Sequence, residues 1–146
     1  MADNAVTIET LQKLITRGPF NQWLNFTILK MDEAGIELKA AWREEWVVNP
    51  DRRYTHGGIL AAIVDVAADY AIAAQLGRPV PTIDIRVDYH KAAMPGDLIA
   101  KAKIVRSGSQ YSTAEAYLYD KEGALVASGR GTYFPAPPKR NLEPNS

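Results

Sequence analysis

Cysteine is absent from this chain of 146 residues, so the sequence excludes a disulfide framework and a thiolate metal site. Histidine is scarce. His56 and His90 belong to no cluster of other ligand types, and we expect no metal site. Also missing are the Gly-rich phosphate loops of nucleotide-binding proteins, a Gly-x-Ser-x-Gly elbow and a cysteine nucleophile. We therefore expect chemistry that needs neither a metal nor a bound cofactor.

Net charge is absent as well, because 17 basic residues balance 17 acidic ones. No basic stripe stands out, so we do not expect nucleic acid as a partner. The N-terminal sequence MADNAVTIET is acidic and has no apolar core, which is not typical of a signal peptide. The apolar segment 56–77 is too short, too rich in alanine and too acidic for a convincing membrane span. These features favour a cytoplasmic protein that does not insert into a membrane.

The spacing of apolar residues predicts an α+β domain. Helical spacing predicts a short helix over residues 6–17, ended by Gly18-Pro19. A long helix is predicted over residues 59–76, and it is apolar on nearly every side. Strands are predicted over residues 25–31, 35–43, 81–89, 98–105, 111–119 and 124–134.

A helix that is apolar all round must be surrounded. The simplest solution is an antiparallel β-sheet wrapped around this one long central helix. Short turns join the last four strands, which predicts an antiparallel meander. One sheet layer cannot cover every side of the helix, so we expect a homo-oligomer. Residues 1–134 would form this single domain, and residues 135–146 a flexible tail.

Two carboxylates, Asp65 and Asp69, interrupt the long helix. They lie four residues apart and share a face, with Cβ atoms about 6 Å apart. Their charges repel, and burial disfavours both ionised forms, so the pair costs stability unless something compensates. The face could line a subunit interface or a wet groove. For Asp65 we favour a working carboxylate, whereas one base suffices and a direct role for Asp69 is not required.

The segment His56-Gly57-Gly58 opens the long helix. Backbone N–H groups in a first helical turn have no internal partner, and the helix dipole adds partial positive charge there. Glycine lets a ligand approach the backbone closely, so this turn suits a developing oxyanion. The alternative is that the glycines serve only a tight turn and close packing. His56 could be a donor, a base or a structural histidine.

The stretch HGGILAAIVDVAADYA resembles the His-Gly-Gly…Asp signature of the hotdog-fold acyl-CoA thioesterases, in the phenylacetate-degradation (PaaI-like) branch. That pattern has an acidic residue eight positions after the first glycine, as Asp65 follows Gly57. The similarity continues through VPTIDIRVDYHKAAMPGDLIAKAKIVRSG and ALVASGRGTYF, and it covers residues 25–134. The resemblance implies the hotdog fold, a homodimer or homotetramer with active sites at the dimer interface, and an acyl-CoA substrate. Coenzyme A would be part of that substrate.

The resemblance also implies roles for single residues. Asp65 corresponds to the catalytic carboxylate, as general base on water or as nucleophile. Gly57 supplies the backbone N–H that polarises the thioester carbonyl, and His56 helps to hold the thioester. Asn49 corresponds to an upstream asparagine that orients water or substrate. Thr82 matches a Ser/Thr that reaches in from the partner chain.

Two positions depart from the family pattern. Many relatives have Asn-x-x-Gly before the His-Gly-Gly, whereas this chain has NPDRRYTHGG. A related branch has Thr or Ser four residues after the carboxylate, where this chain has Asp69. Further residues are candidates for substrate binding. Beside Gly58 and Asp69, these are Trp46 and Tyr54 in an acyl pocket, and Lys91, Arg106, Ser107, Gly108 and Ser109 at the phosphates of coenzyme A.

Each of these binding residues has a structural alternative. The two aromatic side chains could be ordinary core, and the turn at residues 106–109 could be a solvated hairpin turn. We interpret the sequence as an acyl-CoA thioester hydrolase that acts on an aromatic or medium-chain acyl group. One alternative is an acyl-thioester hydratase or dehydratase, although its Pro-rich loop around a catalytic histidine is absent. The other is a non-enzymatic acyl-CoA-binding protein, against which Asp65 argues.

Overall fold

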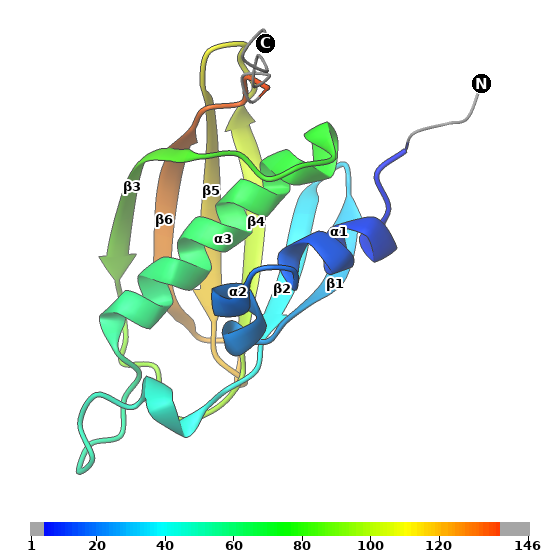
Figure 1. Cartoon of the computed structure of the whole chain (residues 1–146). Helices are drawn as coiled ribbons and strands as arrows, with labels where there is room; N and C mark the ends of the chain where they lie inside the picture. Colours follow the sequence, from blue (N-terminus) through cyan, green and yellow to red (C-terminus); the bar gives the residue numbers. More distant parts are fainter. Residues whose placement is uncertain (1–4, 138–146) are drawn as a thin grey trace, which may run out of the picture.

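Helix α3 (Gly57–Leu76) lies across one face of a six-stranded antiparallel sheet (Figure 1). The structure, a computed structural model, describes residues 5–137. The other helices are α1 (Ile8–Ile15), α2 (Pro19–Leu24) and the short 3₁₀ helix η1 (Glu44–Trp46). The strands are β1 (Phe26–Asp32), β2 (Gly35–Ala40), β3 (Thr82–Tyr89), β4 (Leu98–Arg106), β5 (Ser112–Tyr119) and β6 (Leu125–Tyr133). The predicted α+β fold, a sheet packed around one long helix, is confirmed.

The N-terminal segment forms two helices, whereas the sequence predicted one. Thr7 caps α1, because its side chain accepts a hydrogen bond from the N–H of Thr10 at 3.1 Å. The Gly18-Pro19 pair ends α1 as predicted, but Pro19 also begins α2. Proline suits a first helical position because that N–H has no intrahelical acceptor to lose.

The order of the strands is β1-β2-β4-β5-β6-β3, and all pairs are antiparallel. The predicted four-strand meander is correct for β4 to β6 and wrong for β3. Residues 90–97 carry the chain from β3 to the start of β4 without forming a hairpin, and β3 lies beyond β6 at one edge of the sheet. As a result β3 is an edge strand, and most of its residues are exposed.

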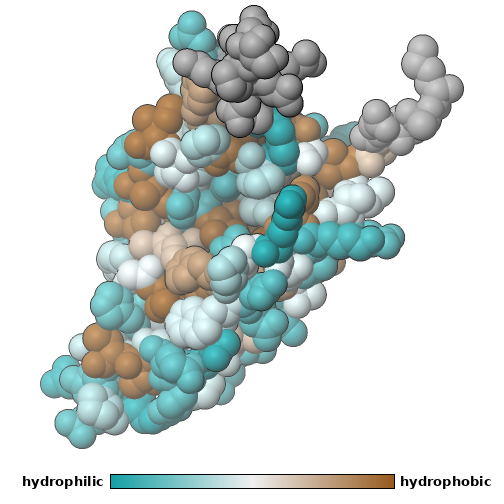
Figure 2. All heavy atoms as spheres, viewed as in Figure 1, coloured by the Kyte–Doolittle hydropathy of each residue, from teal (hydrophilic) through white to brown (hydrophobic). Residues whose placement is uncertain are grey.

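The core lies between α3 and the sheet. Ile63, Val64 and Ala67 of α3 are completely buried. By length and composition α3 could also cross a membrane, but half of its most apolar stretch is buried within the protein, as in a core helix. In the view of Figure 2, apolar side chains gather on the surface over α3 and β3. On β3, the apolar side chain of Ile83 is 59% exposed.

A β-bulge at the start of β3 turns one side chain toward α3. Thr82 pairs with Tyr133 of β6, but the next pair joins Asp84 to Thr132, so Ile83 is skipped. Strict alternation along the strand would put Thr82 on the same face as Asp84. The extra residue breaks that alternation, and the hydroxyl of Thr82 faces the helix.

The predicted tail starts within the described residues. Pro135 is buried, and its carbonyl oxygen accepts a hydrogen bond from the guanidinium of Arg78. The remainder of the predicted tail, residues 138–146, lies outside the described residues.

Candidate functional site

The first turn of α3 leaves one backbone donor available. His56 is the N-cap, and its Nδ1 accepts a hydrogen bond from the N–H of Gly58 at 2.8 Å. The N–H groups of Ile59 and Leu60 donate to the carbonyl oxygen of His56. For the N–H of Gly57, residues 5–137 provide no acceptor. The structure therefore occupies the Gly58 donor and leaves the Gly57 donor free for a ligand.

Tyr89, at the end of β3, packs on this turn. Its hydroxyl donates to the carbonyl oxygen of Gly57 at 2.8 Å. A Cβ atom on Gly57 would lie 3.3 Å from the ring of Tyr89, closer than most such contacts. Glycine thus allows the ring to approach. Tyr89 was not among the predicted site residues, although it ends the regular strand predicted over residues 81–89.

The carboxylate of Asp65 lies two turns further along α3, half-buried, with two hydroxyl donors on one oxygen. Its Oδ1 accepts from Thr82 Oγ1 at 2.9 Å and from the Tyr133 hydroxyl at 3.0 Å. Burial, and after it the charge of Asp65, raise the pKa of the Tyr133 phenol, so that Tyr133 stays a donor. Thr82 was predicted to reach in from a partner chain. Within the single chain that the structure describes, the bulge of β3 brings its hydroxyl to Asp65.

Asp69, which is half-buried like Asp65, holds the backbone. Its Oδ1 accepts a hydrogen bond from the N–H of Val80 at 2.9 Å. Burial raises the pKa of Asp69 to about 7; the Val80 N–H opposes this shift, and the charge of Asp65 adds to it. The structure gives Asp69 the role of an anchor for the segment that leads into β3.

Within one chain, the Gly57 N–H and the Asp65 carboxylate lie far apart, although the resemblance assigns both to one active site. Gly57 and Asp65 are eight residues apart on one helix, which corresponds to ~12 Å along the axis. A thioester carbonyl bound at the Gly57 N–H is therefore beyond the reach of the Asp65 carboxylate of the same chain. A working pair would need a second copy of α3.

Asn49 and Trp46 do not reach this site in the single chain. Asn49 Oδ1 accepts from the N–H groups of Asp51 and Arg52, at 2.9 and 3.0 Å, and so holds its own turn. For Trp46 the sequence left open pocket or core, and the structure buries the side chain completely in the core. Its Nε1 has no hydrogen-bond partner among residues 5–137.

Tyr54 and Lys91 do lie together. They line a hollow of about 370 Å³ beside the first turn of α3, together with Leu60 and Tyr89. Lys91 Nζ also lies 3.7 Å from Asp120 Oδ2, in the turn between β5 and β6. The hollow has an apolar wall and a cation at its edge, a combination that suits an amphiphilic ligand.

The other predicted phosphate contacts form the turn between β4 and β5. The guanidinium of Arg106 lies over the ring of Tyr111, 5.2 Å from its centre, and the N–H of Gly108 donates to Ser112 Oγ at 3.2 Å. The two serines of this turn, Ser107 and Ser109, are exposed.

This turn is distant from the first turn of α3. The register of the sheet puts Arg106 in the same row as Asp84, three strands away and five residues before Tyr89. The spacing of residues and strands then separates Arg106 from Gly57 by roughly 20 Å. Within one chain the structure does not join this turn to the Gly57 donor.

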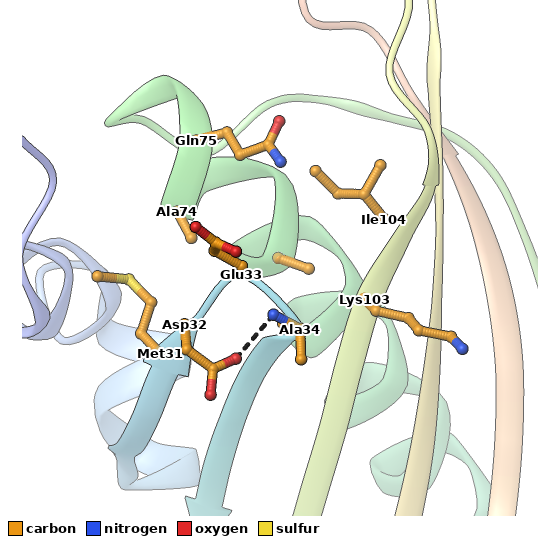
Figure 3. A pocket seen from close by; sticks show the side chains of 10 residues that line it. Met31, Asp32, Glu33, Ala34, Ala74, Gln75, Lys103 and Ile104 are labelled. Atoms are coloured by element: carbon orange, nitrogen blue, oxygen red, sulfur yellow. Dashed lines mark hydrogen bonds between the residues drawn. The ribbon is translucent and has the colours of Figure 1, made fainter.

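A further hollow, of about 670 Å³, lies at the other end of α3, between its C-terminal turns, β4 and the turn from β1 to β2 (Figure 3). Ala71, Ala74 and Ile104 form its apolar part, and Glu33 and Gln75 lie at its edge. None of the predicted site residues lines it. Within residues 5–137 no group of three or more acidic or histidine side chains is placed to hold a metal ion.

The sequence pattern of the family described as "Thioesterase superfamily" matches residues 53–127, which include the first turn of α3 and Asp65. An esterase-named protein of Halobacterium salinarum is 32% identical over 143 residues, covering 90% of this chain and 93% of that protein. The medium/long-chain acyl-CoA thioesterase YigI of Escherichia coli is 26% identical over 132 residues, covering 80% and 84%.

Solved structures agree with the fold. A crystal structure of a protein from the thioesterase superfamily is 48% identical and has a TM-score of 0.85, covering 87% of this chain and 96% of that one. The PaaI protein of E. coli, from the phenylacetic acid degradation operon, is 21% identical with a TM-score of 0.76, covering 86% and 90%. At that identity PaaI supports the fold. Together these findings show that the chain belongs to the thioesterase superfamily, as a thioester hydrolase with the PaaI-like hotdog fold.

Proposed function

We propose that the chain hydrolyses acyl-CoA thioesters of aromatic or medium-chain acyl groups, in a site that two copies of the chain build together. The observation that carries the proposal is the separation of Gly57 from Asp65 on one straight helix. Two α3 helices that pack antiparallel about a two-fold axis would bring Gly57 of one copy near Asp65 of the other. The exposed apolar surface over α3 and β3 is suited to that contact (Figure 2).

The reaction needs a base, a positioned water and a donor for the carbonyl oxygen. Asp65 would take a proton from water as the water oxygen attacks the thioester carbon, or would attack that carbon itself. The N–H of Gly57 would stabilise the negative oxygen, with His56 beside it; loss of such a donor costs ~10²–10³ in rate. The carbon–sulfur bond then breaks, and coenzyme A leaves as a thiolate that takes up a proton. Where Asp65 itself attacks, water then hydrolyses the mixed anhydride between Asp65 and the acyl group, which releases the acid and restores the carboxylate. A thioester needs no metal for this step, because thiolate leaves readily.

The hollow beside the first turn of α3 supports the proposed substrate class. Tyr54, Leu60 and Tyr89 give it an aromatic and aliphatic wall, and Lys91 supplies a cation that could meet a phosphate. The acyl-CoA substrate named for YigI supports coenzyme A as the leaving group. Asn49 and the turn at residues 106–109 are proposed to contribute from the second copy. We place this activity in the cytoplasm.

A thiol-release assay over a panel of acyl-CoAs tests the proposal. The panel spans phenylacetyl, hydroxybenzoyl, medium-chain and branched acyl groups, and crotonyl-CoA hydration is followed in parallel. We expect thiol release from wild type and a loss of at least ~10³-fold in Asp65→Asn. Asp84→Asn is the matched control, since Asp84 is an exposed carboxylate on β3.

Near-normal turnover by Asp65→Asn would exclude the assigned role of Asp65. Hydration of crotonyl-CoA without thiol release would favour a hydratase. Tight acyl-CoA binding without either reaction would favour a binding protein.

A further inference from the structure

We infer that Tyr133 is a positioning residue that orients the Asp65 carboxylate, so that Oδ2 is the oxygen that acts on the substrate. The inference rests on the proposed function, because it names the working atom of the proposed base. It follows from the contacts of the two carboxylate oxygens. Oδ1 accepts from Thr82 and Tyr133, whereas no donor within residues 5–137 lies within hydrogen-bond distance of Oδ2.

The two donors approach from different strands. Thr82 belongs to β3 and Tyr133 to β6, and the two residues are direct partners in the sheet. The Tyr133 hydroxyl also lies 3.0 Å from the backbone carbonyl oxygen of Asp65. One phenol thus contacts both the side chain and the backbone of the same residue. The single hydroxyl proton is shared between these two oxygens, which holds the phenol oxygen against the side chain and the backbone of Asp65.

Tyr133 reaches α3 because β6 makes room for it. Its side chain is completely buried and lies over Gly131, two residues earlier on the same strand. A Cβ atom on Gly131 would lie 2.3 Å from the Tyr133 hydroxyl and 2.4 Å from its ring, which no real contact allows. Two backbone features, this glycine and the bulge before Asp84, therefore direct two hydroxyls to one oxygen.

The arrangement has a chemical consequence. Hydrogen bonds from neutral donors stabilise the ionised carboxylate. Since both donors occupy Oδ1, the proton from water goes to Oδ2, or Oδ2 attacks directly. The titratable groups that face Asp65 among residues 5–137 are Tyr133 from β6 and Asp69 from its own helix. Strand β3 contributes the neutral hydroxyl of Thr82.

The variant Tyr133→Phe tests the inference. It keeps the ring and removes the donor. We expect kcat to fall about tenfold with KM nearly unchanged. We also expect the acidic limb of the pH profile of kcat/KM to move to higher pH, because the carboxylate loses one hydrogen-bond donor. Tyr70→Phe is the matched control, because Tyr70 is also buried but its hydroxyl makes no hydrogen bond to residues 5–137.

Two further measurements separate positioning from a purely structural role. In an Asp65→Asn background, Tyr133→Phe should cause no additional loss of rate. The carboxyl carbon of Asp65, followed by NMR in the free protein, should titrate at higher pH in Tyr133→Phe than in wild type. Should the phenylalanine variant not fold, 3,5-difluorotyrosine at position 133 keeps the shape, and as a stronger donor it should move the same midpoint to lower pH.

An unmoved NMR midpoint and pH profile would overturn the inference, even if kcat fell together with stability. The same effect in Tyr70→Phe would overturn it too. Failure of the proposed function looks different. Wild type would then release no thiol from any acyl-CoA, while the NMR titration would still decide whether Tyr133 acts on Asp65.

Discussion

The Oδ1 atom of Asp69 accepts a hydrogen bond from the backbone N–H of Val80 at 2.9 Å. This contact joins the middle of α3 to the segment before β3, two residues ahead of Thr82. A carboxylate that fixes backbone in a buried position stabilises the local geometry, but it is costly when ionised. Asp69 therefore links the position of Thr82 to pH.

We expect Asp69→Asn to flatten the dependence of stability on pH. The folded pKa of about 7 lies above the unfolded value of 3.8, so the folded state binds more protons between these values. Stability is then lost as pH rises from about 4 to about 7, by up to ~4 kcal/mol. Asparagine keeps an oxygen for Val80 and cannot ionise. Urea unfolding from pH 4.5 to 8 should show that the variant becomes more stable relative to wild type as pH rises. Parallel curves of unfolding free energy against pH would contradict this.

We expect Gly129→Ala to destabilise the fold by about 3 kcal/mol. An added Cβ would lie 2.4 Å from the backbone oxygen of Arg86 and 2.7 Å from the Val64 side chain. Backbone cannot move aside as a flexible side chain can, so β3 must shift away from β6. Gly18→Ala is the control, with nothing within 4 Å of its added Cβ, and it should cost less than about 1 kcal/mol. Urea unfolding checks both variants, and equal effects would contradict the packing argument.

We expect Ile83→Asp to dissociate the protein and abolish turnover together. Ile83 is exposed on the edge strand β3, in the surface assigned to the second copy. Leu29→Asp is the control, because Leu29 is exposed on β1 at the opposite edge. Light scattering should give wild type and the control at least twice the chain mass of 16.1 kDa. A wild-type monomer with full activity would refute the two-copy site.

We expect Arg106→Ala to raise KM for acyl-CoA by about tenfold, with a smaller change in kcat. A phosphate contact far from the reacting carbonyl strengthens binding of ground state and transition state alike. Arg52→Ala, in an exposed loop, is the charge-matched control. Steady-state kinetics at low and high salt should show that added salt reduces the difference. A change in kcat alone would argue against a phosphate contact.

Residue patterns predicted the elements well. The Gly-Gly start and the Gly77 end of α3 could be predicted from the sequence, because a first turn and a left-handed C-cap have narrow residue preferences. Alternation located the strands to within a few residues. Their order in the sheet could not be predicted, because the position of β3 beside β6 depends on long-range packing and not on its neighbours in sequence.

The candidate site was predicted in part. Asp65 and Gly57 follow from a local motif. The bulge at Ile83, which turns Thr82 inward, could not be predicted because apolar and polar residues alternate regularly through it in the sequence. Tyr133 was missed as well. The signal available was the Gly-x-Gly-x-Tyr pattern from Gly129, in which two absent side chains leave space for a large inward one. Such a pattern gains meaning only when the inward face is known.

The place of β3 beside β6 also affects how the chain matures during translation. β3 leaves the ribosome before its strand neighbour, since β4 and β5 are synthesised in between. Until β6 emerges, β3 has no partner strand, and one side of the apolar helix stays uncovered. Pairing of β3 with β6 is then a late, long-range step in forming the sheet. Thr82 and Tyr133 meet across that last pairing, so the carboxylate they hold acquires its orientation only once synthesis of the domain is complete.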